Sequence, residues 1–275
     1  MVDTFSYSQK VSVTAAEKAE YFEFAAITAK AAGAVTLPFF RADVIVENKG
    51  ADGKYDPVTE ADKAAETVVR DALARAYPGH GIMGEEFGYQ TGNGLTWVID
   101  PIDGTRAFMS GMLHWGVLLA LFDGETPIVG AMYQPYTDEL FVGDTERAVF
   151  RRGDEQRPLH TSSCTDVSRA VLATTGVEWF DESERPQFDR LREQAQLCRI
   201  GGDCYLFGML AMGYVHIGTD ANLQPYDIQA LVPIVQGAGG VITTYDGGDP
   251  SMGGTVVASA NPALHHEVLS LINNA

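Results

Sequence analysis

The segment 95–105 constrains the fold most, because an apolar run is followed at once by two closely spaced aspartates. Residues 95–99 are rich in β-branched and aromatic side chains, which predicts a buried strand that ends there. Asp100 and Asp103 follow, and Pro101 between them restricts the backbone to a narrow geometry. Two carboxylates at the end of a buried strand repel each other. A divalent cation with oxygen ligands is the usual compensation.

The next two residues extend this interpretation toward phosphate chemistry. Gly104 and Thr105 suit a tight turn that opens a helix, and the free amides of a helix start favour an anion. A metal ion and an anion side by side indicate phosphate chemistry. The alternative is structural: Asp100 ends a strand and Asp103 caps a helix, with no metal. A short motif taken alone favours this alternative.

Composition limits the classes of partner. The chain of 275 residues is long enough for one large domain or two packed ones. Its net charge of −18 argues against nucleic acid and anionic membrane surfaces, which require clustered Lys and Arg. A small anionic substrate is compatible with this charge, because bound divalent cations reverse the sign locally.

Cysteine usage and hydropathy indicate the compartment. Cys164, Cys198 and Cys204 are odd in number and lack metal-type spacing, so they are interpreted as reduced thiols. No leader-like or membrane-spanning segment is recognised. The protein is therefore expected to be cytoplasmic.

Helical spacing dominates the start of the chain and strand patterns follow. Thr14 and Glu17 form a capping-box pattern. The elements expected in this half are a helix over 15–39, a strand over 44–46, a polar loop over 48–55, a helix that follows Thr59 and ends at Ala76, and antiparallel strands over 115–122, 128–134, 139–142 and 148–152.

The second half alternates between strands and helices, which predicts an α/β half with partly parallel pairing. A polar stretch over 157–168 marks the expected boundary, giving halves 1–157 and 158–275. The expected strands cover 171–174, 199–200, 215–218, 241–244 and 255–258, and the expected helices cover 186–196, 205–212, 224 or 225 to 236, and 262–272.

Further acids stand at positions with two interpretations. Asp62 fits a helix-start box with Thr59, and Asp227 falls in a first helical turn, where the helix dipole favours an acid. Glu85 and Glu86 are adjacent carboxylates, which are usually solvated at the surface. Taken singly, each acid has an ordinary structural explanation.

Four linked motifs stand out when these acids are taken with their neighbours: Pro57-Val58-Thr59-Glu60-Ala61-Asp62, Gly84-Glu85-Glu86, Asp100-Pro101-Ile102-Asp103-Gly104-Thr105, and Pro225-Tyr226-Asp227 followed by Gly237-Ala238-Gly239-Gly240. In this order and at these separations they resemble the inositol monophosphatase superfamily of magnesium-dependent phosphomonoesterases, over nearly the whole chain. The resemblance implies an α/β (α+β) layered sandwich of the inositol monophosphatase / fructose-1,6-bisphosphatase type, with the metal site where the two halves meet.

The resemblance also implies a ligand set for two or three Mg²⁺ ions. Glu85, Asp100 and the carbonyl of Ile102 hold the first ion. Asp100, Asp103 and Asp227 hold the second, and Glu85 helps to hold a looser third through water. Carboxylate and carbonyl oxygens are the ligands that magnesium prefers.

The resemblance also implies which residues bind the phosphate and which orient the attacking water. Gly104 and Thr105 receive the phosphate, while Asp62 and Thr105 orient the attacking water. No cysteine or serine nucleophile is required.

Within the superfamily, the segments 103–108, 110–111, 115–116 and 201–204 resemble the histidinol-phosphate phosphatase branch. Its substrate carries a cationic amine, so Asp203 and Asp220 are expected to contact the substrate, and Arg106 is a third candidate. Helix capping by Asp203 and surface packing by Arg106 are the structural alternatives. Leu113-His114 and the Asp at position 220 depart from the branch pattern.

The leading hypothesis is a homodimeric enzyme of histidine biosynthesis that hydrolyses L-histidinol phosphate to L-histidinol and phosphate. A second hypothesis is a phosphatase of the same fold for inositol 1-phosphate, another sugar phosphate or a nucleotide bisphosphate. A third is a non-catalytic metal-binding protein, against which the complete set of acids argues.

Overall fold

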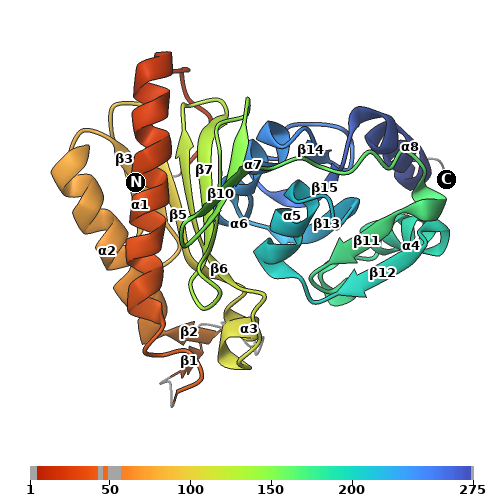
Figure 1. The fold of residues 1–275 in the computed structure, drawn as a ribbon, viewed down its shortest axis with the longest axis horizontal. Coiled ribbons are helices and arrows are strands. Elements are labelled where there is room, and N and C mark those ends of the chain that lie inside the picture. The colour runs from red at the N-terminus through yellow and green to blue at the C-terminus, as the bar shows by residue number, and fades with distance from the viewer. Residues whose placement is uncertain (1–4, 43–45, 49–56, 274–275) are drawn as a thin grey trace.

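The computed structural model describes residues 5–42, 46–48 and 57–273 (Figure 1). Its helices are α1 (Ala15–Thr36), α2 (Glu60–Ala76), α3 (Thr105–Met109), α4 (Glu184–Gln194), α5 (Asp203–Ala211), α6 (Pro225–Ile228), α7 (Leu231–Gly237) and α8 (Pro262–Asn273), with 3₁₀ helices η1 (Val167–Arg169) and η2 (Val177–Trp179). Its strands are β1 (Val46–Asn48), β2 (Pro57–Thr59), β3 (Gly81–Gly84), β4 (Gly88–Gln90), β5 (Thr96–Asp103), β6 (Gly116–Phe122), β7 (Pro127–Gln134), β8 (Glu139–Gly143), β9 (Ala148–Arg152), β10 (Glu155–Pro158), β11 (Val171–Thr174), β12 (Leu197–Ile200), β13 (Ile217–Leu223), β14 (Val241–Thr244) and β15 (Gly254–Ser259).

In the described part of the chain, these strands form two large sheets and the small hairpin β1–β2. The eight-stranded sheet has the order β10-β9-β8-β7-β6-β5-β3-β4, and only its β3–β5 pair is parallel. The five-stranded sheet has the order β12-β11-β13-β15-β14, in which β11 runs parallel to both of its neighbours. The predicted meander and the partly parallel second half are both confirmed.

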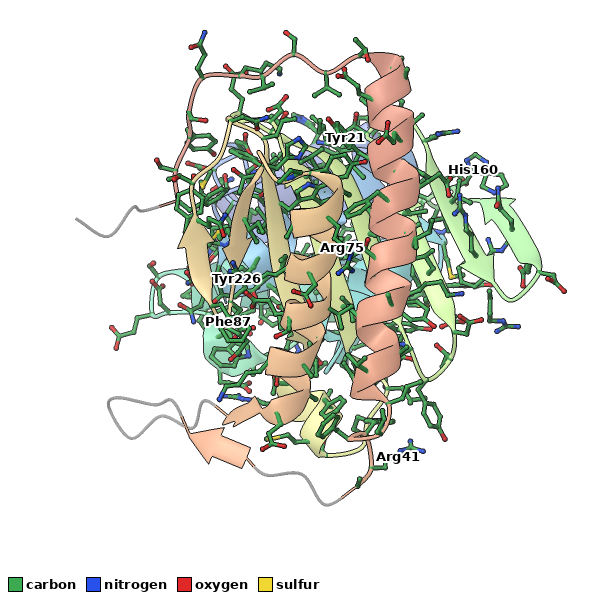
Figure 2. All side chains as sticks on the ribbon, turned by 90° about the vertical axis from the view of Figure 1, so that its left-hand side faces the viewer. Tyr21, Arg41, Arg75, Phe87, His160 and Tyr226 are labelled. Carbon is green, nitrogen blue, oxygen red and sulfur yellow. The ribbon has the colours of Figure 1, made fainter. Side chains whose placement is uncertain are left out.

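Helices lie on both sides of the two sheets. Helices α1 and α2 cover one face of the eight-stranded sheet, as Figure 2 shows from that side. Helices α5, α6 and α7 lie between the sheets, and α4 and α8 cover the far face of the five-stranded sheet. The layered α/β sandwich expected from the sequence is confirmed.

Alternation along β5 explains why its residues 97–99 are all apolar. Trp97 and Ile99 pack in the cluster under α1 and α2, whereas Val98 faces the cluster formed with α5 and α7. Successive side chains of a strand point to opposite faces, and here both faces are covered. The pairing of β5 with β6 becomes irregular only at the end of the strand, between its charged residues Asp100 and Asp103.

That irregular end is longer than the sequence predicted. The expectation that the strand stops at Ile99 is wrong, since β5 continues to Asp103. Its register with β6 shifts between Asp100 and Asp103. A proline inside a sheet is tolerated at such an irregularity because its missing N–H leaves no ladder bond unmade, and Pro101 lies there.

The helix predicted from 224 or 225 to 236 is also corrected, because two short helices, α6 and α7, stand in its place. Pro233 has no N–H and its ring clashes with the carbonyl four residues earlier, that of Gln229. The break falls at Gln229 and Ala230. The broken helix packs closely on β7: a Cβ atom on Gly130 would lie 2.0 Å from the carbonyl oxygen of Ala230.

The remaining boundaries agree with the sequence within a few residues. The capping box of Thr14 and Glu17 is present, and α1 ends at Thr36 instead of Phe39. Of the strand expected over 44–46 and the loop over 48–55, only residues 46 and 48 fall within the described residues, both in β1. No described helix has the length and apolar character needed to span a membrane.

The division into halves at 157/158 stays a prediction. The last strand of the eight-stranded sheet ends at Pro158 and the first strand of the other sheet begins at Val171. Both sheets nevertheless share one core, since the cluster around α5 and α7 contains Phe141 of β8 as well as Val256 of β15.

Phe207 on α5 tests how strongly this shared core holds the fold. Its side chain is 2% exposed between the two sheets. We expect Phe207→Ala to lower the free energy of unfolding by about 3–5 kcal/mol, because it leaves a cavity in that layer. Urea unfolding measures the loss. Ile27→Ala, at a side chain 68% exposed on α1, is the control and should change stability by less than about 0.5 kcal/mol.

Candidate active site

Three acids from distant parts of the chain meet where β5 ends. Asp100 and Asp103 belong to β5, and Asp227 belongs to α6, which packs on β5. One carboxylate oxygen of each lies within 4.8 Å of those of the other two. Asp100 is only 2% exposed. The fold thus brings together the three acids predicted to share one metal ion.

The electrostatics of Asp100 show that two more predicted acids lie nearby. Burial raises the pKa of Asp100 well above its usual range, and negative charges on neighbouring carboxylates raise it further, namely Glu85, Asp103, Asp227 and Asp62. Burial likewise raises the pKa of Asp227 to about 8, with a contribution from the charge of Asp103. These values express the free-energy cost of keeping several carboxylates ionised in one desolvated place.

The donor set fits a divalent metal. Within residues 5–42, 46–48 and 57–273, no ion pair with lysine or arginine is seen for Asp100, Asp103 or Asp227. Carboxylates held this close together without a cationic side chain stay ionised only if a counter-charge comes from outside the chain; otherwise they take up protons. Oxygen-only ligands select a hard cation such as Mg²⁺.

The turn after Asp100 is held by its own hydrogen bonds. The Ile102 amide donates to Asp100 Oδ1 at 3.1 Å, and the Thr105 hydroxyl donates to the Ile102 carbonyl at 3.0 Å. Gly104 takes a left-handed φ of 81° and leads into α3. A carbonyl oxygen has two lone pairs, so the Ile102 carbonyl retains one acceptor site for a metal ion.

The second half of the chain clamps this turn. The Cys204 amide in the first turn of α5 donates to Asp103 Oδ2 at 2.7 Å. A Cβ atom on Gly104 would lie 3.1 Å from Cβ of Asp203. The start of α5 therefore lies directly against the segment from Asp103 to Gly104.

Asp203 does not cap α5, so that alternative is wrong. The N-cap residue of α5 is Gly202, so no side chain caps the helix. Asp203 is the first helical residue and has a φ of 42°. Such a conformation costs a non-glycine residue roughly 1–3 kcal/mol and is concentrated at functional sites. Burial raises the pKa of Asp203 to about 8. The charges of Asp103 and Asp220 add to this effect and Arg106 opposes it.

Asp220 is engaged mainly by the end of β11. Its Oδ1 accepts from the Thr174 hydroxyl at 3.0 Å and from the Thr175 amide at 2.6 Å, while Oδ2 accepts from the Thr175 hydroxyl at 2.7 Å. Burial raises its pKa to about 7, and these bonds oppose that rise. Asp220 thus ties β13 to β11 beside the acids, and a direct substrate contact stays a prediction.

Arg106 joins the two halves at the rim of the site. Its side chain is exposed on α3, and its guanidinium carbon lies 4.4 Å from the ring centroid of Trp179 in η2. This is a cation–π distance. The packing interpretation of Arg106 is therefore supported, although its charge also reaches Asp203. Trp179 escaped the sequence analysis because a lone aromatic residue carries no motif signal.

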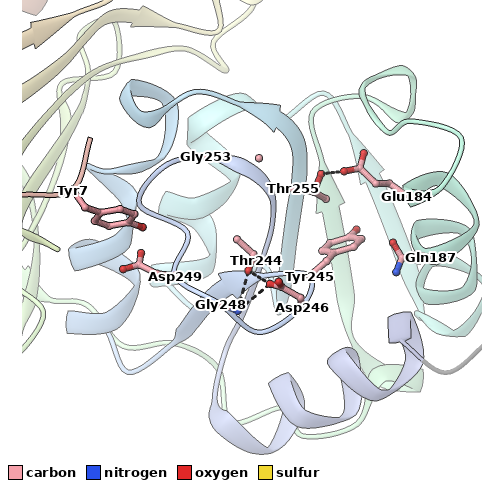
Figure 3. Close-up of a pocket in the computed structure, with 11 residues that line it drawn as sticks. Tyr7, Glu184, Gln187, Thr244, Tyr245, Asp246, Gly248, Asp249, Gly253 and Thr255 are labelled. Carbon is pink, nitrogen blue, oxygen red and sulfur yellow. Dashed lines mark hydrogen bonds between the residues drawn. The ribbon is translucent and has the colours of Figure 1, made fainter. Parts of the chain in front are cut away.

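A separate surface hollow of about 500 Å³ contains none of the predicted site residues (Figure 3). Tyr7, Glu184 and the loop after β14 line it. Its acids are already used locally: Glu184 accepts from Thr255, and Asp246 accepts from Thr244. The hollow therefore does not resemble the unneutralised acid cluster.

Comparison with known proteins agrees with this geometry. A family model described as the inositol monophosphatase family matches residues 17–275. The chain is 36% identical over 234 residues to a chloroplastic bifunctional phosphatase of Arabidopsis thaliana, covering 83% of this chain and 66% of that protein, which is slightly less than two thirds. It is 34% identical over 249 residues to a histidinol-phosphatase of Chlorobaculum parvum, covering 90% and 94%. A solved inositol monophosphatase from Zymomonas mobilis superposes with a TM-score of 0.84 at 33% identity, covering 95% of this chain and 100% of that one.

The raised carboxyl pKa values predict how the metal-free protein responds to pH. The folded pKa is about 8 for Asp203 and Asp227 and about 7 for Asp220, against about 3.9 for an unfolded aspartate. Near neutrality the folded chain therefore binds more protons than the unfolded chain. The free energy of unfolding should fall as pH rises from about 7 to 8. Urea unfolding in a chelating buffer measures it.

Two controls accompany this pH measurement. Burial lowers the pKa of His80, His216 and His265, the last to about 4, so these groups destabilise the fold only as pH falls below the chosen window. Asp227→Asn should reduce the slope, and saturating Mg²⁺ should flatten it. If the free energy of unfolding in the chelating buffer is constant or increases with pH over this window, the raised pKa values of Asp203, Asp220 and Asp227 are contradicted.

Proposed function

Because the chain belongs to the inositol monophosphatase family, we propose that it is a magnesium-dependent phosphatase that hydrolyses L-histidinol phosphate to L-histidinol and phosphate. The phosphatase class follows from the family, whose members are metal-dependent. The observation that carries the proposal is the meeting of Asp100, Asp103 and Asp227 beside a fourth acid, Asp203, whose backbone is strained. The relatives named histidinol-phosphatase support the choice of alcohol.

The metal ligands in this proposal are Glu85, Asp100, the Ile102 carbonyl, Asp103 and Asp227, which would hold two or three Mg²⁺ ions. Their support is the shared charge environment around Asp100. When bound, the ions neutralise the phosphate oxygens and acidify a water molecule. The protein's own contribution is to hold Asp100, Asp103 and Asp227 together at a place where, among the described residues, no lysine or arginine forms an ion pair with them.

Asp62 and Thr105 are proposed to orient the attacking water, and Gly104 and Thr105 to receive the phosphate. Asp62 is buried in the first turn of α2, and its charge reaches Asp100. The Thr105 hydroxyl donates to the Ile102 carbonyl and keeps two lone pairs that can accept from water. The start of α3 offers backbone amides to an anion.

Asp203 is the main proposed contact for the alcohol, with Asp220 and Arg106 beside it. A carboxylate binds an ammonium group through a charge-assisted hydrogen bond. Asp203 stands in a costly backbone conformation next to Gly104, where the phosphate would lie. The ammonium group of an amine-bearing alcohol would bind the Asp203 carboxylate at that position.

A phosphatase for inositol 1-phosphate, another sugar phosphate or a nucleotide bisphosphate is the second candidate. Relatives named inositol monophosphatase favour it. The first proposal also includes a cytoplasmic homodimer that serves histidine biosynthesis. Leu197 and Ile200 are exposed on the edge strand β12, and an apolar edge of this kind supports pairing with a second copy of the chain.

Removal of the metal or of a ligand tests the chemistry. We expect chelation to abolish phosphate release from histidinol phosphate and added Mg²⁺ to restore it. Asp100→Asn and Asp227→Asn should each lower kcat at least about 100-fold, because each removes an anionic ligand. Asp154→Asn, at an exposed turn, is the charge-matched control and should leave kcat unchanged. Activity that persists in excess chelator would rule out the metal mechanism.

The choice of alcohol is tested at Asp203. A charge-assisted hydrogen bond contributes about 1.5–3 kcal/mol, so Asp203→Asn should lower kcat/KM for histidinol phosphate roughly 10- to 100-fold. Hydrolysis of glycerol 2-phosphate, whose alcohol has no charge, should fall less than about three-fold. Initial rates on both substrates with one enzyme preparation measure the difference. Equal losses would favour the inositol or sugar phosphate candidate.

A further inference from the structure

The turn that carries Glu85 rests on a buried carboxylate from α2. The side chain of Glu66 is fully buried, at 0% exposure. Its Oε2 accepts from the Glu86 amide at 2.8 Å, and its Oε1 accepts from the Phe87 amide at 3.3 Å. A Cβ atom on Gly84 would lie 1.9 Å from Oε1 of Glu66. Only glycine therefore fits at the start of this turn while Glu66 holds its position.

Arg70 supplies the charge that makes this burial tolerable. Its Nε donates to Glu66 Oε1 at 2.7 Å, and its Nη2 donates to the Gly88 carbonyl at 2.6 Å, at the far end of the turn. Its guanidinium carbon also lies 5.8 Å from the ring centroid of Phe87, which is seen beside α2 in Figure 2. A buried carboxylate is costly unless it is paired and hydrogen-bonded, and here it is both.

The turn is fixed from its other side by β5. The Glu85 amide donates to the Ile99 carbonyl at 3.3 Å, and Gly84 stands opposite Ile99 in the parallel pair of β3 and β5. Ile99 directly precedes Asp100. The backbone of Glu85 is thus held between α2 and the strand that carries the acid cluster.

We propose that Glu66 is a positioning residue for the metal site: with Arg70 it fixes the turn that directs the Glu85 carboxylate toward Asp100. This inference rests on the proposed role of Glu85 as a metal ligand. Asp62, Glu66 and Arg70 are spaced by four residues and share one face of α2. That face therefore orients the proposed water-binding acid and supports a metal ligand at the same time. Mutation of a residue that orients a metal ligand without touching the metal typically weakens metal binding about 10- to 100-fold.

Glu66→Gln is the informative variant because it keeps the shape of the side chain. Glu66 accepts hydrogen bonds from two backbone amides of the turn. A glutamine has one oxygen and one NH₂ group, so one of those amides would face a donor and its hydrogen bond would be lost. We expect Mg²⁺ binding to the metal-stripped protein, measured by titration calorimetry without substrate, to weaken about 10-fold or more. The Mg²⁺ concentration for half-maximal activity should rise in parallel, with kcat at saturating Mg²⁺ close to wild type.

Asp71→Asn is the matched control, since it removes one negative charge from the exposed face of the same helix. Its Mg²⁺ affinity should stay within about two-fold of wild type. A double-mutant cycle then locates the effect. Once Glu85→Gln has removed the ligand, adding Glu66→Gln should weaken binding no further.

Each outcome decides between the two proposals. Unchanged Mg²⁺ affinity in Glu66→Gln, or full additivity of the two substitutions, overturns the positioning role and leaves the proposed function standing. A wild-type chain that binds no Mg²⁺ overturns both. If Glu66→Gln shows no cooperative thermal transition, Arg70→Lys carries the test. Lysine keeps the positive charge but lacks the planar guanidinium that donates to Glu66 and to the Gly88 carbonyl at once. If this variant binds Mg²⁺ as tightly as wild type, the inference is overturned.

Discussion

The mutual repulsion of buried carboxylates at the end of β5 is the constraint on which the rest of this structure depends. Asp100 and Asp103 come from the eight-stranded sheet, and Asp227 comes from the helices packed between the sheets. Asp100 is buried away from water, and among the described residues none of the three acids forms an ion pair with a lysine or arginine. Protons or a cation from solution are the remaining ways to relieve the repulsion, and only a cation does so while the carboxylates stay ionised.

Local patterns predicted most of the fold, whereas the acids were assigned to one site only through the resemblance of several linked motifs. Strand alternation, the capping box at Thr14 and the proline and glycine positions each act over a few residues, so the sequence alone reveals them. The errors arose where tertiary context overrides a local rule. Apolar periodicity predicted a single helix after residue 224, yet Pro233 breaks it at Gln229. The strand was expected to end at Ile99, but with a shift of register it continues to Asp103.

The contacts that the sequence could not predict are all tertiary. Glu66 and Arg70 at four-residue spacing have the pattern of an ordinary surface ion pair of a helix. Only the fold shows that this pair holds the Glu85 turn and that Glu66 is fully buried there. In the same way, Asp220 matched a motif position, while its bonds to Thr174 and Thr175 depend on β11 lying beside β13.

Three different departures from local rules meet at the end of β5, which marks the site independently of any relative. A proline lies within a central strand, an aspartate takes a left-handed φ at position 203, and carboxylates are buried beside one another at Asp100. Apolar residues of similar volume in place of the buried acids would give a more stable fold. Chains retain such strain where binding or chemistry requires it. A ligand that binds only the folded state also stabilises it, so metal binding offsets part of this cost. Stability and metal affinity are therefore linked, and Glu66, which fixes the turn proposed to carry a metal ligand, is expected to contribute to both.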